Sequence, residues 1–99
     1  MTDPPLLLLY RRDGCHLCDE TRAILDALLA ERAAAGRPTA PVREVDVATD
    51  ADLEARFAFT IPVLEGGGER LELATSAGAI QRFLDRVLDG AGEPERVTP

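Results

Sequence analysis

The chain contains two cysteines, Cys15 and Cys18, separated by His16 and Leu17. This spacing is common and says little by itself, but here the pair follows an apolar run and opens a helical pattern. A cysteine at a helix N-terminus meets unpaired backbone amides and the positive end of the helix dipole, which lower thiol pKa values to ~3.5–7.5. The position therefore predicts that Cys15 attacks as a thiolate and that Cys18, one turn further along, is the more buried resolving thiol.

Charged residues flank the pair on both sides. Arg11 and Arg12 precede it and add positive potential, whereas Asp19 and Glu20 follow in the first helical turn and oppose that potential. The single histidine, His16, either adds positive charge when protonated or is a solvated residue of the first turn. We favour the solvated interpretation, because residues at a helix start usually point outwards.

Two other interpretations of the cysteines fit the sequence less well. A structural zinc site needs four protein ligands, and the chain offers the cysteine pair, one histidine and distant carboxylates. Two inert cysteines in an apolar core would have raised pKa values and little reactivity. The helix-start position favours a redox-active pair, and we expect no bound metal.

The first half of the chain predicts the elements that position this pair. Leu6–Tyr10 is an apolar run typical of a strand buried on both faces. A long helix follows, in which six residues recur at three- and four-residue steps: Leu17, Thr21, Ile24, Leu25, Leu28 and Leu29. Gly36 offers a left-handed cap and Pro38 bars continuation, so the helix should end there. Val42–Val47 then predicts a second strand, with Val45 and Val47 on one face.

The second half predicts a short helix, a hairpin and a last helix. Either Thr49 or Asp50 can cap the short helix, which runs through Phe57. Ile61–Leu64 and Arg70–Leu73, joined by three glycines, predict a β-hairpin.

The last helix can be capped by Thr75 or Ser76. Its core-facing residues are expected to be Ile80, Phe83, Leu84, Val87 and Leu88. The resulting order is βαβαββα. An opening βαβ unit requires two parallel strands with a right-handed crossover, and the hairpin adds antiparallel strands. The sequence thus predicts an α/β fold with a mixed sheet and helices on both faces.

Length and composition limit the function classes. The 99 residues suffice for one domain, expected over residues 1–89, with a polar and flexible tail over residues 90–99. A net charge of −7 and four aromatic residues without tryptophan argue against nucleic-acid binding. We expect no membrane association, because no segment resembles a signal peptide or a membrane span. A reducing, cytoplasmic location is expected, where closely spaced cysteines are more often redox-active or metal-binding than structural.

A second motif, Thr60-Ile61-Pro62-Val63, opens the predicted hairpin. Together with the upstream cysteine pair it resembles the glutaredoxin-like branch of the thioredoxin superfamily. The sequence is most similar to small bacterial proteins with a strand, then Gly-Cys-His-Leu-Cys-Asp-Glu, then Ile-Pro-Val. Here these segments are Leu7–Tyr10, Gly14–Glu20 and Ile61–Val63, and the likeness spans about residues 6–88.

The resemblance implies a thioredoxin-like, four-stranded sheet of order 2-1-3-4 and a thiol–disulfide oxidoreductase with a dithiol mechanism. It implies that Cys15 is the nucleophile, that Cys18 resolves, and that Pro62 is cis and faces the pair. The backbone at Ile61, just before this proline, would then pair with the bound thiol substrate. We also expect Thr60, Arg12 and His16 to contribute to the substrate-binding surface.

The chain departs from glutaredoxins proper in two places. It has His16-Leu17 where they have Pro-Tyr, and Ala74–Ala77 where they have a Gly-Gly and acidic residues that grip glutathione. Because of these departures we leave glutathione or another low-molecular-weight thiol open as co-substrate. We expect no bound organic cofactor. The expected partner is a disulfide-bearing protein or a small thiol substrate, and the expected state is a monomer.

Two other functions stay open on the sequence. One is a dimeric carrier that holds an iron–sulfur cluster through Cys15 and external thiols. The other is a catalytically silent binding module of the same fold.

Overall fold

The computed structural model describes residues 6–90 of the chain. Four strands form one sheet of order β2-β1-β3-β4, together with three α-helices and one 3-10 turn. The strands are β1 (Leu7–Arg11), β2 (Val42–Asp46), β3 (Val63–Gly66) and β4 (Glu69–Leu71). The helices are α1 (His16–Ala34), α2 (Ala51–Phe57) and α3 (Ala77–Asp89), with the 3-10 turn at Val47–Thr49. The predicted order of elements is confirmed.

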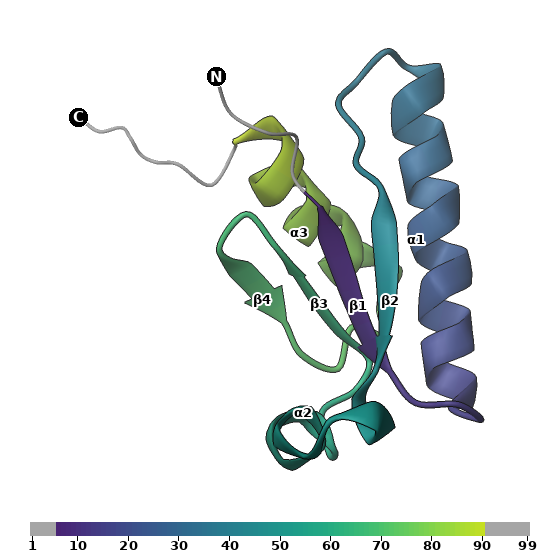
Figure 1. Cartoon of the computed structure of the whole chain (residues 1–99). Coiled ribbons are helices and arrows are strands. Elements are labelled where there is room, and N and C mark those ends of the chain that lie inside the picture. The colour runs from purple at the N-terminus through teal and green to yellow at the C-terminus, as the bar shows by residue number, and fades with distance from the viewer. Residues whose placement is uncertain (1–5, 91–99) are drawn as a thin grey trace.

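Strand pairing makes the sheet mixed, as predicted. Strand β1 runs parallel to β2, with Leu9 opposite Glu44, and antiparallel to β3, with Leu9 opposite Leu64. Strands β3 and β4 form the antiparallel hairpin. Helix α1 crosses from β1 to β2, so β1 is central and its C-terminal end leads directly into the cysteine pair (Figure 1).

Helix α1 ends where the sequence predicts. Gly36 adopts a φ of 73°, and its N–H bonds the carbonyl of Ala33 at 3.0 Å. The N–H of Arg37 bonds the carbonyl of Arg32 at 2.8 Å. These two bonds satisfy carbonyls that a helix end would leave unpaired, and the left-handed conformation that allows them costs glycine little.

The structure resolves both open choices of helix cap. Asp50 caps α2, accepting from the amides of Asp52 and Leu53, and Ser76 caps α3 through the amide of Ala79.

The hairpin strands differ from the prediction. Strand β3 begins at Val63 instead of residue 61, and β4 ends at Leu71 instead of residue 73. The reason lies before β3, where residues 60–62 bond to the last residue of α2 and to the loop after β4, and not to a neighbouring strand.

Two hydrophobic clusters lie on opposite faces of the sheet. Because side chains alternate along β1, Leu7 and Leu9 face α1 and α3, whereas Tyr10 faces α2. The larger cluster contains Leu7, Leu9, Leu25, Leu64, Ala74, Ile80, Phe83 and Leu84. The smaller one contains Tyr10, Val47, Phe57 and Val63. The helices therefore cover both faces, with α2 only at one end (Figure 1).

One residue of the predicted α1 core stripe does not reach the core. Thr21 and Leu25 are fully buried, but the side chain of Leu17 is 49% exposed. The first turn of α1 lies at the end of the sheet (Figure 1), beyond the larger cluster. The predicted burial of Leu17 is therefore wrong, because periodicity does not show where the sheet ends.

Ion pairs join the ends of α1 and α3. Arg32 is buried and its guanidinium bonds Asp85 at 3.1 Å and also Asp89. Arg37 bonds the other oxygen of Asp89 at 2.5 Å. Burial favours the neutral form of Asp89, but hydrogen bonds from Arg37 and Arg32 outweigh it and hold the pKa of this carboxyl below its usual value.

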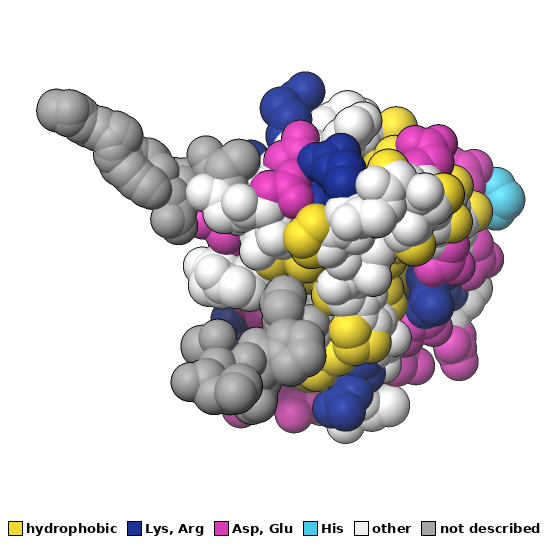
Figure 2. Space-filling model, turned by 90° about the horizontal axis from the view of Figure 1, so that it is seen from above, with side chains coloured by type: hydrophobic (Ala, Val, Ile, Leu, Met, Phe, Trp, Pro, Cys, Tyr) yellow, Lys and Arg dark blue, Asp and Glu magenta, His cyan; other side chains and the backbone are white. Residues whose placement is uncertain are grey.

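On the face seen in Figure 2, acidic and basic side chains stand close together and hydrophobic groups reach the surface in narrow strips between them. Within residues 6–90, no helix is both long and apolar enough to cross a membrane. The residues of the predicted tail beyond Gly90, and residues 1–5 of the predicted domain, lie outside the described range.

Candidate functional site

Cys15 occupies the N-cap position of α1. Its carbonyl accepts the N–H of Asp19 at 3.1 Å, the first bond of the helix. Its Sγ atom accepts the N–H of Cys18 at 3.1 Å, in the place where an oxygen of Ser or Asp would normally cap a helix. The turn before it bonds the Cys15 N–H to the carbonyl of Arg12 at 3.1 Å, so the residue is fixed from both sides.

The two cysteines form a disulfide, with Cα atoms 5.2 Å apart. Their exposure differs as predicted: Cys15 is half-buried, whereas Cys18 is fully buried under the first turn of α1. An incoming sulfur atom can therefore reach Cys15 and not Cys18. In the reduced form, the amide of Cys18 and the N-terminal end of the helix would stabilise a thiolate at Cys15.

The two arginines before the pair are both engaged by carboxylates. Arg11 contacts Asp19 at 2.7 Å and Glu44 at 3.9 Å. Arg12 points to α2 and contacts Glu54 at 3.0 Å. The positive potential predicted from these residues is thus opposed by Asp19, as predicted, and also by two carboxylates from β2 and α2 that sequence proximity did not indicate.

His16 points away from the molecule. Its side chain is 85% exposed, and its Nε2 atom lies 3.1 Å from a carboxylate oxygen of Glu20 in the next turn. The solvated interpretation of His16 is confirmed by this exposure, while its expected part in substrate binding stays a prediction.

The segment Thr60–Pro62 is held by the loop that follows β4. The N–H of Leu73 bonds the carbonyl of Thr60 at 2.8 Å, and the N–H of Ala74 bonds the carbonyl of Pro62, also at 2.8 Å. The Ile61–Pro62 peptide bond is cis, the isomer that the resemblance implies, and Pro62 is buried. Among the backbone hydrogen bonds of residues 6–90 that lie outside helices and strands, none involves the carbonyl of Ile61.

A buried hydrogen bond connects this segment to the cysteine helix. Thr21, one turn after Cys18, donates its hydroxyl to the carbonyl of Ala74 at 2.5 Å. The backbone of Ala74 in turn holds Pro62. The periodicity of α1 had indicated Thr21 only as a core position, although a hydroxyl inside an apolar stripe signals a need for a partner.

The hydroxyl of Thr60 has a different environment. Its Oγ1 atom is buried and, within the part of the chain that the structure describes, has no hydrogen-bond partner. Thr60 therefore contacts the loop after β4 by a hydrogen bond of its backbone carbonyl, to the N–H of Leu73, and by none of its side chain.

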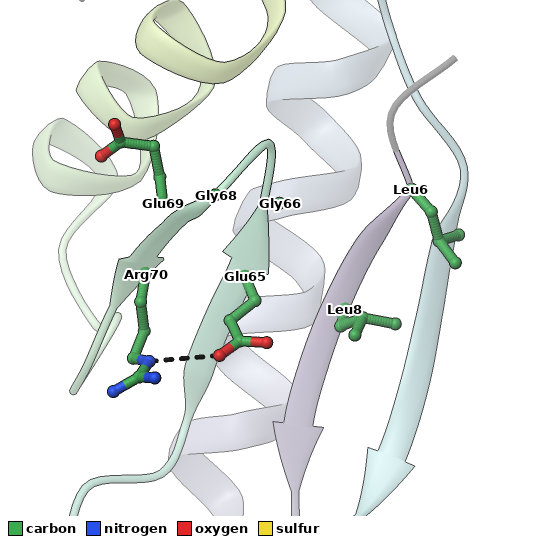
Figure 3. A pocket seen from close by; sticks show the side chains of 7 residues that line it. All are labelled: Leu6, Leu8, Glu65, Gly66, Gly68, Glu69 and Arg70. Atoms are coloured by element: carbon green, nitrogen blue, oxygen red, sulfur yellow. Dashed lines mark hydrogen bonds and ion pairs between the residues drawn. The ribbon is translucent and has the colours of Figure 1, made fainter. Parts of the chain in front are cut away.

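One hollow on the surface lies away from the cysteine pair. It has a volume of about 440 Å³ and lies over β1, β3 and β4, on the sheet face that α2 leaves open. Figure 3 shows Leu6 and Leu8 on one side and the ion pair between Glu65 and Arg70, 3.1 Å long, on the other. None of the predicted site residues lines it.

Across residues 6–90, no cluster of three or more His, Cys, Asp or Glu is arranged to hold a metal ion.

The arrangement supports redox chemistry in general, because it joins an accessible sulfur at a helix start to a buried sulfur within bonding distance. Comparison with known proteins agrees. The sequence matches the model of the Glutaredoxin-like domain (DUF836) over residues 6–87. None of the curated proteins matches the chain.

Solved structures share the fold. The X-ray structure of protein XcR50 from X. campestris is 31% identical and has a TM-score of 0.65, with 80% of this chain and 95% of that chain covered. The solution structure of protein Ne2328 from Nitrosomonas europaea is 27% identical, with a TM-score of 0.58 and coverage of 93% and 94%. A mutant thioredoxin from Halobacterium salinarum, 18% identical with a TM-score of 0.57 and coverage of 98% and 80%, shows the fold alone. The predicted thioredoxin-like fold is confirmed.

Proposed function

The chain belongs to the glutaredoxin-like domain family, and from this premise we propose that it is a thiol–disulfide oxidoreductase that works through Cys15 and Cys18. One observation carries the proposal. Cys15 is the accessible N-cap residue of α1 and its sulfur accepts the N–H of Cys18, whose own sulfur is buried. This difference between the two sulfurs is what a dithiol mechanism needs, because one must attack and the other must act only afterwards.

In the first step the Cys15 thiolate attacks one sulfur of a substrate disulfide. A bond forms between Cys15 and that sulfur, the substrate S–S bond breaks, and the second substrate sulfur leaves as a thiolate that takes a proton from solvent. The backbone amide of Cys18, which contacts the Cys15 sulfur at 3.1 Å, supports the attacking thiolate.

In the second step Cys18 attacks the Cys15 sulfur. The mixed disulfide breaks, the Cys15–Cys18 disulfide forms, and the first substrate sulfur leaves as a thiol after it takes up a proton. The substrate has gained two electrons, and the protein is left in the oxidised form that the structure shows. A thiol donor, such as glutathione or another small thiol, must then reduce the pair by the reverse exchange.

We further propose that the substrate lies along Thr60–Pro62. The carbonyls of Thr60 and Pro62 are already bonded to Leu73 and Ala74, whereas that of Ile61, which neither of these bonds involves, accepts a backbone N–H of the substrate. Arg12 and His16 lie on either side of the cysteine turn in sequence, and their carboxylate partners Glu54 and Glu20 set the charge that a substrate meets there. We propose a monomer without a bound cofactor.

A small neutral disulfide tests the function directly. Hydroxyethyl disulfide is mixed with limiting dithiothreitol as donor, and its reduction is followed with and without the protein. We expect acceleration by the wild-type chain and none by Cys15→Ser. An equal rate without protein, or full activity of Cys15→Ser, would contradict the proposal.

A further inference from the structure

Three large apolar side chains near the candidate site are exposed. Within residues 6–90 the exposed large hydrophobic residues are Leu6, Leu17, Phe59 and Leu73. Single exposed apolar residues are common and need no explanation. Here, however, only Leu6 lies away from the site. Leu17 separates the two cysteines, Phe59 precedes Thr60, and Leu73 is the residue bonded to Thr60.

Hydrogen bonds connect the three segments that carry these residues. Leu17 precedes Thr21 by one helical turn on the same face of α1. Thr21 bonds the carbonyl of Ala74, which is the residue after Leu73. Leu73 in turn bonds the carbonyl of Thr60, which is the residue after Phe59. We call Leu17, Phe59 and Leu73 the apolar patch.

The backbone of Leu73 gives an independent reason to look for a ligand here. Leu73 is the one non-glycine residue of the described range with a positive φ, at 51°. This left-handed conformation is strained for a residue with a Cβ atom. The side chain gains no compensating burial, because it is 55% exposed. Phe59, at 94% exposed, likewise packs against nothing in this part of the chain. Both side chains would gain burial only when something binds.

The charges around the patch select the kind of partner. Helix α2 and the start of α1 lie at the same end of the sheet (Figure 1). Residues 11–20 and 44–57, which build this end, contain eight carboxylates and three arginines. Arg11 and Arg12 are paired with carboxylates, and Arg56 lies over the Phe57 ring at 4.8 Å. An anionic ligand such as glutathione, which carries two carboxylates and one ammonium at neutral pH, meets an unfavourable field here. A cationic partner meets a favourable one.

Resting on the proposed function, we propose that the patch docks a polypeptide in which apolar residues flank the reactive disulfide and basic residues lie further out. The apolar side chains cover Phe59 and Leu73, and the basic ones face the carboxylates of α1 and α2. The carbonyl of Ile61 bonds the backbone between them. The site is thereby built for protein disulfides in preference to glutathione disulfides.

The test uses mixed disulfides that release coloured thionitrobenzoate when Cys15 attacks them. Three thiols are each joined to thionitrobenzoate as a mixed disulfide. The first is a peptide with apolar residues beside its cysteine and arginines at both ends, the second is the same peptide with glutamates at its ends, and the third is glutathione. We expect the basic peptide to react fastest with the reduced protein and its rate to fall as salt is added. Equal rates for all three probes, or a faster acidic peptide, would overturn the proposal.

Variants locate the effect. Phe59→Ser and Leu73→Asn should each lower kcat/KM for the basic peptide about tenfold, the value of burying one apolar side chain. Asparagine is chosen because it tolerates a positive φ. The matched control is Leu6→Ser, an exposed apolar residue away from the site, which should leave this rate unchanged. An equal loss in Leu6→Ser, or none in the patch variants, would overturn the proposal.

Hydroxyethyl disulfide distinguishes a failure of the patch proposal from a failure of the proposed function. If the patch is wrong and the function is right, this neutral probe is reduced normally and the peptide rates of the patch variants do not change. If the function itself is wrong, the wild-type chain accelerates the reduction of neither hydroxyethyl disulfide nor the basic peptide.

Discussion

The hydroxyl of Thr21 donates a hydrogen bond of 2.5 Å to the backbone carbonyl of Ala74, and both residues are fully buried. Because the N–H of Ala74 bonds the carbonyl of Pro62, this bond ties the helix of the two cysteines to the segment that we propose for the substrate. The distance between the attacking sulfur and the substrate backbone thus depends on a contact that contains neither cysteine.

Replacing Thr21 by valine should destabilise the protein by about 1–3 kcal/mol, because valine keeps the shape but leaves the Ala74 carbonyl buried without a partner. The free energy of unfolding in urea measures this. Thr49→Val is the matched control, since the Thr49 hydroxyl bonds the carbonyl of Asp46 at 2.7 Å but is exposed, so water can replace it. Equal losses in the two variants would contradict the buried role of Thr21.

The elements of the fold could be predicted because each depends on local chemistry. The apolar run of β1, the glycine after α1 and the capping residues before α2 and α3 determine where elements begin and end within a few residues. The cysteine pair was predicted for the same reason, since a helix start alone gives Cys15 its amide contact with Cys18.

What the sequence did not show are contacts between distant segments. The pairing of Arg12 with Glu54 joins residues 42 positions apart, and that of Thr21 with Ala74 joins residues 53 apart. The exposure of Leu17 depends on where the sheet ends, and the positive φ of Leu73 has no glycine or asparagine to indicate it. These features can be identified only once the three-dimensional fold is known.

Removing the charge of Asp89 should change how stability depends on pH. Hydrogen bonds from Arg37 and Arg32 lower the pKa of Asp89 from its usual value of 3.8, despite the opposing effect of burial. The ionised carboxylate therefore stabilises the fold fully above the unfolded-state pKa, and this contribution is lost as pH falls through the lower folded-state pKa. Asp89→Asn should be about 1–2 kcal/mol less stable at neutral pH, and the difference should shrink below about pH 4.

Urea unfolding of the oxidised protein at several pH values measures this difference. Glu31→Gln, an exposed carboxylate of α1 outside the ion pairs that the structure describes, is the control. A stability difference between wild type and Asp89→Asn that stays constant down to pH 2 would contradict the assignment.

In the reduced protein, Cys15 should be alkylated well before Cys18 at neutral pH, because only Cys15 combines exposure with the amide contact at the helix start. Brief treatment with iodoacetamide and peptide mass mapping reveals the order. In urea the two cysteines should react at similar rates, which controls for local sequence. Preferential labelling of Cys18 in the folded protein would reverse the roles.

The dithiol mechanism depends on what happens after the first attack. If Cys18 resolves the intermediate, Cys18→Ser still attacks through Cys15 but cannot release the product. If an external thiol resolves it instead, Cys18→Ser releases product and stays active.

The most direct measurement is therefore the fate of Cys18→Ser with a disulfide-bearing protein substrate, followed by intact-protein mass spectrometry and by a glutathione-coupled activity assay. We predict a stable mixed disulfide at Cys15, none with Cys15→Ser, and a large loss of coupled activity in Cys18→Ser. Full activity of Cys18→Ser without any trapped intermediate would contradict the dithiol mechanism.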